Sequence, residues 1–138
     1  MMDQSALLKC LLEGKPFLRY QDLRSGLTPF ARGDLLIREG EVATVFHLIY
    51  QGRVQLIKQH PDGQPRRTTT LSRGSSLGLP AVLADSAYSA TALALTPGQT
   101  YSISQTALQQ FLARYPRYYR PLAQQLARTL LHYEKLAI

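Results

Sequence analysis

Residues 74–95, GSSLGLPAVLADSAYSATALAL, are the stretch of the chain whose residue types and order could hold a small molecule. A glycine turn, a short apolar run and a strand rich in Ser, Thr and Ala follow one another, an order typical of an anion-binding loop. However, the stretch contains one acidic residue, Asp85, and no basic residue. The hydroxyl groups of Tyr88, Ser89 and Thr91 would suit an uncharged polar ligand better than a phosphate.

The other residues that could carry chemistry do not form the patterns that catalysis or metal binding requires. His47, His60 and His132 show neither an H-x-H motif nor a nearby glutamate, so no metal site is predicted. The serines have no His/Asp arrangement and no G-x-S-x-G motif to expose a nucleophile. The acidic residues within 34–41 are explained by turn chemistry. We therefore predict that the protein is not an enzyme.

Length and composition predict one domain, 1–138. The chain has 138 residues with 45% hydrophobic content, enough for one core and too short for two comfortable domains. Its N-terminus carries an acidic residue before any apolar stretch, so neither a signal peptide nor a membrane span is predicted. The single cysteine, Cys10, cannot form an internal disulfide, which agrees with a reducing compartment. These features predict a cytoplasmic protein.

The net charge of +7 permits an acidic partner, nucleic acid and membrane surfaces included. Most arginines are scattered among the expected strands and turns, and only Arg114, Arg117, Arg120 and Arg128 gather in one helical region. The scatter favours a solvated surface over a binding patch. Direct DNA binding and membrane binding are therefore not predicted.

The hydrophobic period changes along the chain from helical to alternating and back. Residues 4–14 predict an amphipathic helix that ends at a glycine. HPDGQ (60–64) predicts a hairpin turn. Runs rich in β-branched and aromatic residues predict strands at 34–40, 44–52, 53–59, 66–71, 91–95 and 100–103. The fold class is therefore mainly β, an antiparallel β-roll or jelly roll over about 30–104, flanked by helices.

From Gln105 onward the pattern predicts helices over about 105–136. Pro116 stops or restarts the helix, and Pro121 kinks it or begins a new one. A spacing of 4, 3, 4, 3, typical of a seam between two helices, follows at Leu122, Leu126, Thr129, Tyr133 and Leu136. The seam covers barely two heptads, so a homodimer through 122–136 and a helix packed on its own domain both remain open.

Several segments taken together resemble the cyclic nucleotide-binding domain of Crp/Fnr-type sensors, kinase regulatory subunits and gated channels. The resemblance covers about residues 5–136, and it rests on the order of FARGDLLIREGE (30–41), VFHLIYQGRVQLIK (45–58), PDG (61–63), LSRGSSLGLPAVL (71–83) and YSATALAL (88–95). It implies a β-roll of antiparallel strands with flanking helices. It also implies a ligand site in the stretch that follows residue 76.

In that family the phosphate-binding cassette reads roughly F-G-E-x-A-L, a spacer, then R-S/T-A. The matching residues here, which we call the cassette, are Leu77, Gly78, Leu79, Pro80, Ala81, Val82, Tyr88, Ser89 and Ala90. Leu79 stands where the family has a glutamate that accepts the ribose hydroxyl. Tyr88 stands where it has an arginine that pairs with the cyclic phosphate. The resemblance therefore implies a ligand site that lacks both charges.

The two substitutions matter because each removes a charge-assisted hydrogen bond of about 1.5–3 kcal/mol, together about two to four decades of affinity. We predict that cyclic AMP and cyclic GMP are not bound tightly in the usual mode. A pocket for another small molecule and an empty, structural pocket both remain open. Arg73, at the turn before the cassette, is a candidate for a substitute cation, although a solvated turn residue is the simpler explanation.

Three functions remain. The first is a regulatory ligand-binding module whose helices 105–136 shift with the ligand, and the resemblance implies a lid over the base from Leu130, Leu131 and Tyr133. The second is the sensor half of a Crp/Fnr-type transcription regulator without its helix-turn-helix, for which no room is expected after Ile138. The third is a ligand-free protein-interaction domain that uses RYPRYYRP (114–121) as its contact.

Overall fold

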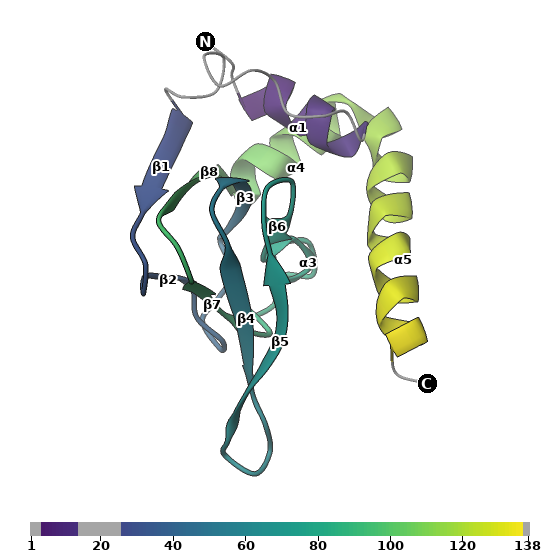
Figure 1. Cartoon of the computed structure of the whole chain (residues 1–138). Helices are drawn as coiled ribbons and strands as arrows, with labels where there is room; N and C mark the ends of the chain where they lie inside the picture. The colour runs from purple at the N-terminus through teal and green to yellow at the C-terminus, as the bar shows by residue number, and fades with distance from the viewer. Residues whose placement is uncertain (1–3, 14–25, 137–138) are drawn as a thin grey trace. The chain divides into compact units, whose positions relative to one another are not determined.

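A computed structural model of the chain describes residues 4–13 and 26–136, except for the side chains of 4–6, 67–68 and 133–136. The chain divides into two compact units. Of the described residues, the first unit contains 26–105 and the second contains 4–13 together with 106–136. Figure 1 labels their helices and strands.

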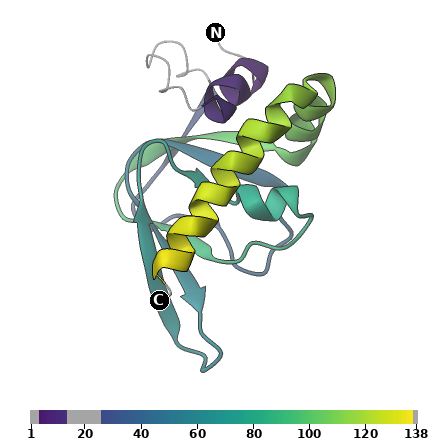
Figure 2. The ribbon, with the colours of Figure 1, turned by 90° about the vertical axis from the view of Figure 1, so that its right-hand side faces the viewer.

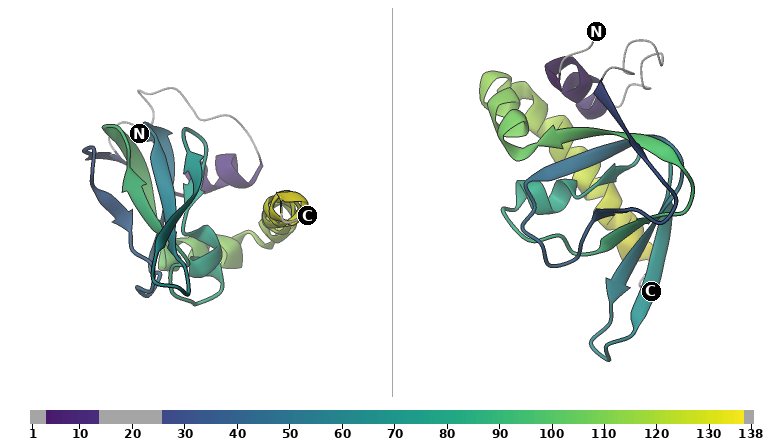
Figure 3. Two further views of the ribbon diagram at one scale, coloured as in Figure 1. Left: turned by 60° about the horizontal axis from the view of Figure 1, so that its bottom comes forward. Right: turned by 90° about the vertical axis from the view of Figure 1, so that its left-hand side faces the viewer.

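The first unit is an antiparallel β-roll with one short helix, α3 (Leu79–Leu83). Its strands are β1 (Leu27–Phe30), β2 (Leu35–Ile37), β3 (Val45–Gln51), β4 (Val54–Gln59), β5 (Pro65–Leu71), β6 (Ser76–Leu77), β7 (Thr91–Ala94) and β8 (Gly98–Ser104). They form two four-stranded sheets with the orders β1-β8-β3-β6 and β2-β7-β4-β5. The β4–β5 hairpin extends beyond the rest of the roll (Figures 1 and 3). The predicted fold class, a β-roll with flanking helices, is confirmed.

Strand β3 forms the centre of the first sheet, because it pairs with β8 on one side and with β6 on the other. Its apolar run places Phe46, Leu48 and Ile49 in the core, each with 0% of its surface exposed. At the end of β3 the backbone passes very close to the start of β8. A Cβ atom built on Gly98 would lie 2.1 Å from the carbonyl oxygen of Gln51. Only glycine fits that crossing.

The second unit contains α1 (Gln4–Leu12), α4, which begins in the first unit (Gln105–Arg114), the 3-10 turn η2 (Pro116–Tyr118) and α5 (Tyr119–Leu136). Pro116 begins η2, as the sequence predicts for a residue that stops one helix and restarts another. Pro121 lies in the first turn of α5, where its missing N–H has no partner to lose. Figure 2 shows the bend between α4 and α5. The rings of Phe111, Tyr115 and Tyr118, from this part of the chain, pack together.

His47 lies in the middle of β3, and its Nδ1 atom is 2.9 Å from the hydroxyl oxygen of Ser102 on β8. Burial lowers the pKa of His47 below its usual value, because the imidazolium would lose hydration there. A hydrogen bond with the backbone of Leu36 partly opposes this shift in the pKa. The folded roll therefore favours a neutral His47.

Stability is expected to fall as the pH drops below about 6.5, because the unfolded chain then binds a proton at His47 that the folded chain does not. Because of this residue, the free energy of unfolding changes by at most about 1.4 kcal/mol per pH unit. His47→Gln should remove this change. His60→Gln, in the exposed hairpin turn, should not. Urea unfolding across this pH range measures both variants, and an unchanged slope in His47→Gln would contradict the assignment.

Candidate functional site

The cassette begins on the short strand β6 and continues into α3. Between them Gly78 has φ +85°, in the left-handed region that favours glycine. Pro80 stands in the first turn of α3, where a missing N–H is tolerated. The N–H of Val82 donates to the carbonyl oxygen of Gly78 at 3.1 Å, which fixes the start of the helix. The local sequence therefore builds the sharp turn that the cassette requires.

The second limb of the cassette runs antiparallel to the turn at residues 40–43. The N–H of Tyr88 donates to the carbonyl oxygen of Glu41 at 2.9 Å. The carbonyl oxygen of Tyr88 accepts from the N–H of Gly40, also at 2.9 Å. An isolated β-bridge joins Val42 to Ala87 next to this pair. The backbone of Tyr88 is thus held from both its donor and its acceptor side.

The side chain of Tyr88 lies on the cassette glycine. Only 6% of Tyr88 is exposed, and its hydroxyl donates to the carbonyl oxygen of Val45 at 2.5 Å. A Cβ atom built on Gly78 would lie 2.7 Å from Cε1 and 3.1 Å from Cδ1 of the Tyr88 ring. The space next to Gly78 is therefore filled by an aromatic ring of the chain itself.

Both positions at which the resemblance implies a charge hold buried, uncharged side chains in this structure. Leu79 is 2% exposed and Tyr88 is 6% exposed. The one charged residue within 77–90 is Asp85, and its Oδ1 atom accepts from Nε2 of Gln105 at 2.6 Å. The same Nε2 atom donates to the carbonyl oxygen of Val82 at 2.8 Å. Asp85 and Gln105 therefore join the end of α3 to the start of α4.

The neutral hydroxyl groups predicted as ligand partners have different surroundings. The Tyr88 hydroxyl is bonded within the roll, and the hydroxyl of Thr91 accepts from the N–H of Glu39 at 3.0 Å. Ser89 is exposed, as is Pro80, while Ala81 and Ala90 are half-buried. Ser89 is thus the hydroxyl of this group that an incoming molecule would reach first.

Gly78→Ala is expected to lower the free energy of unfolding by about 2 to 4 kcal/mol. Alanine is strained at this positive φ, and its Cβ atom would also press on the Tyr88 ring. Gly74→Ala is the matched control, because Gly74 has φ +92° with nothing within 4 Å of the added atom. Urea unfolding should show a clearly smaller loss for the control. Equal losses would mean that the ring does not constrain position 78.

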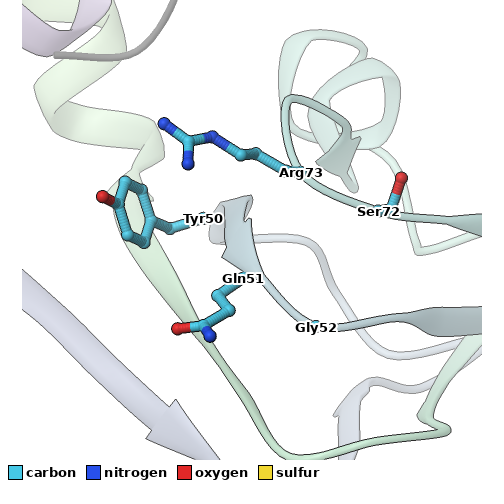
Figure 4. A pocket seen from close by; sticks show the side chains of 5 residues that line it. All are labelled: Tyr50, Gln51, Gly52, Ser72 and Arg73. Carbon is cyan, nitrogen blue, oxygen red and sulfur yellow. The ribbon is translucent and has the colours of Figure 1, made fainter. Parts of the chain in front are cut away.

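Arg73, the candidate for a substitute cation, lies against the ring of Tyr50. Its guanidinium carbon is 4.6 Å from the ring centroid of Tyr50, and the two side chains lie next to each other (Figure 4). They line a pocket of about 410 Å³ together with Gln51, Gly52 and Ser72. The sequence does not reveal this pocket, because no motif links the end of β3 to the turn before β6. Arg73 is exposed, as the simpler explanation of a solvated turn residue predicts. Its guanidinium also packs on an aromatic ring, which that explanation did not include.

The residues proposed as a lid lie on α5. Leu130 is 60% exposed and Leu131 is 54% exposed, whereas the side chain of Tyr133 is outside the described residues. These residues belong to the second unit and the cassette to the first, so their role as a lid stays a prediction.

Metal ligands do not cluster in the part of the chain that the structure describes. Within residues 4–13 and 26–136, His, Cys, Asp and Glu side chains form no group of three or more that could hold a metal ion. No helix in these ranges is long and apolar enough to cross a membrane.

Solved structures of bacterial regulators share this architecture. The sensor domain of the transcriptional regulator DNR from Pseudomonas aeruginosa is 24% identical, with a TM-score of 0.69 over 99% of this chain and 97% of that one. The N-terminal domain of a transcriptional regulator from Streptomyces coelicolor is 25% identical, with a TM-score of 0.66 over 83% of this chain and 84% of that one. The catabolite activator protein of Thermus thermophilus is 22% identical, with a TM-score of 0.74 over 92% of this chain and 61% of that one. This chain thus spans about three fifths of that last protein.

The family comparison agrees with the fold. No curated protein sequence matches this chain. The model of the cyclic nucleotide-binding domain matches residues 27–115, which is more than half of the chain and includes every strand of the roll and the whole cassette. The matched segments and the two-sheet roll lead to one conclusion: the chain belongs to the cyclic nucleotide-binding domain family.

Proposed function

We propose that this protein is a non-enzymatic regulatory domain whose cassette does not bind cyclic AMP or cyclic GMP tightly in the usual mode. One observation carries the proposal: the Tyr88 ring lies against Gly78, at the position where the family's arginine pairs with the cyclic phosphate. A phosphate at this position would have to displace the ring and would meet no cation within the cassette.

The cost of displacing Tyr88 supports this proposal. Exposing a buried aromatic side chain costs about 1.5–3 kcal/mol. Breaking the bond between its hydroxyl and the Val45 carbonyl costs about 0.5–1.5 kcal/mol more. These costs come on top of the missing charge-assisted bonds at positions 79 and 88. Cyclic nucleotide affinity in the millimolar range or weaker is therefore expected.

The regulatory part of the proposal rests on the relatives. The structures from Streptomyces coelicolor and Pseudomonas aeruginosa are described as domains of transcriptional regulators. By analogy with them we propose a sensory role in the cytoplasm for this chain, in which the helices 105–136 shift position when a ligand binds to the roll. A ligand would enter next to the exposed Ser89. In this proposal Leu130, Leu131 and Tyr133 cover it.

A homodimer through residues 122–136 belongs to the same proposal. Of the seam residues, Leu122 is 3% exposed, Leu126 is half-buried and Thr129 is exposed. A second copy would therefore contact the later part of the seam, and burial of Leu126 there would remove apolar surface from water. A sensor half of a longer regulator and a ligand-free interaction domain remain as alternatives, and they predict different behaviour toward small molecules.

Thermal unfolding with cyclic AMP, cyclic GMP and a panel of cyclic dinucleotides at millimolar concentration tests the proposal. A ligand present at 100 times its Kd would stabilise the domain by about 2.7 kcal/mol, which raises Tm by several degrees. We expect no saturable rise. A Crp-type sensor that binds cyclic AMP provides the positive control. A saturable rise for either mononucleotide would overturn the proposal.

A further inference from the structure

The C-terminal part of the chain has an unusual charge pattern that the cassette does not use. The sequence contains no acidic residue between Asp85 and Glu134. The same stretch contains four arginines, at positions 114, 117, 120 and 128. The first three of these arginines are interleaved with tyrosines in the segment RYPRYYRP.

Within the second unit, three cations converge on the ring of Tyr115. The Nζ atom of Lys9 on α1 lies 4.8 Å from the ring centroid. The guanidinium carbons of Arg114 and Arg117 lie 5.5 Å and 5.3 Å from it. Arg117 also lies 4.9 Å from the ring centroid of Tyr118. We call Lys9, Arg114, Tyr115, Arg117 and Tyr118 the basic aromatic cluster.

The two tyrosine rings of this cluster are held in place by contacts within the second unit. Tyr115 and Tyr118 both pack on Phe111, with centroid separations of 5.3 Å and 5.1 Å. Tyr118 is 5% exposed, and its hydroxyl donates to Oε1 of Glu13 at 2.7 Å. Side chains that are already held by such contacts lose less conformational freedom when a partner binds.

The cations of the cluster are available to an anion. Arg114 and Arg117 are exposed and Lys9 is half-buried. Across the residues that the structure describes, no ion pair joins any of these three side chains to a carboxylate. The carboxylate next to the cluster is that of Glu13, which accepts from the Tyr118 hydroxyl. The three cations exceed its single negative charge, so an incoming carboxylate would relieve their remaining repulsion.

We propose that the basic aromatic cluster is a docking site for an acidic segment of a partner protein. The planar guanidinium groups of Arg114 and Arg117 match carboxylates through paired N–H donors. Tyr and Arg are also the residues that anchor protein interfaces most often. The site goes beyond the proposed ligand site, because no cassette residue takes part.

The arrangement favours a peptide over a nucleic acid. A DNA duplex presents a long row of phosphates, and salt-dependent binding to it uses a comparable row of cations. Here the charges converge on one ring instead of forming a row. A short segment with a few carboxylates and an apolar side chain fits this geometry better.

Fluorescence anisotropy with a labelled peptide of alternating Glu and Asp around one Phe tests the proposal. The full chain should bind it at low salt, and Arg114→Gln with Arg117→Gln should weaken binding at least about tenfold. Arg32→Gln with Arg53→Gln is the matched control, because it removes two exposed charges from the roll. The control should weaken binding by less than about threefold. Circular dichroism checks that both variants fold.

Three outcomes would overturn the proposal. The first is no binding of the peptide by the full chain, and the second is an equal loss in the two double variants, which would indicate net charge alone. The third is a labelled DNA duplex that binds more tightly than the peptide and depends on the cluster, which would make the partner a nucleic acid. None of these readouts involves a cyclic nucleotide, so they are independent of the proposed ligand site.

Discussion

Leu79→Glu together with Tyr88→Arg is expected to bind cyclic AMP about two to four decades more tightly than the parent chain. The change removes the ring from the space next to Gly78 and restores an acceptor for the ribose and a cation for the phosphate. The scaffold around both positions is already present, because the turn at Gly78 and the backbone bonds of Tyr88 are in place. Isothermal titration calorimetry measures the gain.

The same double variant should be less stable than the parent when no nucleotide is bound. Leu79 and Tyr88 are 2% and 6% exposed, so two charges would enter a buried region. Leu79→Gln with Tyr88→Leu is the control that opens the cassette without adding charge. It should gain no more than about tenfold in affinity. If the charged variant folds and gains nothing, the cassette does not have the shape of a nucleotide site.

Gly98→Ala is expected to lower the free energy of unfolding by about 4 kcal/mol or more, a larger loss than Gly78→Ala should cause. The added Cβ atom would lie 2.1 Å from the carbonyl oxygen of Gln51 and 2.4 Å from the Phe30 ring. The ring can move, but the carbonyl belongs to β3 at the centre of the sheet. Strands β3 and β8 would therefore have to separate locally.

Two comparisons make this prediction specific. Gly63→Ala, at the hairpin tip, meets nothing within 4 Å and should cost only about 1–2 kcal/mol for its positive φ. Adding Phe30→Ala to Gly98→Ala should not restore stability, because the contact with the backbone remains. Urea unfolding measures all three variants. If Gly98→Ala lowered the free energy of unfolding by less than Gly63→Ala does, strands β3 and β8 would be able to separate locally without a cost in stability.

The sequence allowed most strands to be predicted to within a few residues, because runs of β-branched and aromatic residues bounded by glycine are local signals. Strands β1 and β6 were not predicted. β1 contains Pro29, which is tolerated because β1 lies at the edge of its sheet. β6 has only two residues, Ser76 and Leu77, and exists because β3 offers a free side. Both strands depend on pairing with distant segments, which a local pattern does not contain.

The candidate site was predictable as an order of motifs and not as an arrangement of side chains. The resemblance of the sequence to the family implies that Leu79 and Tyr88 stand in place of charged residues. It does not show that the Tyr88 ring covers Gly78, since that contact depends on the pairing of residues 86–88 with the turn at 40–43. For the same reason, the convergence of Lys9 and Arg117 on one ring lies outside what spacing along the chain reveals.

The burial of positions 79 and 88 also restricts how this cassette can evolve. Leu79→Glu alone, or Tyr88→Arg alone, would place one uncompensated charge in a buried region, which costs several kcal/mol. Natural domains are stable by about 5–15 kcal/mol, so each single step carries a heavy fitness penalty. Either change alone would also restore only one of the two charges that the resemblance implies for a nucleotide site. A lineage that changes one codon at a time meets a valley between this cassette and a nucleotide-binding one.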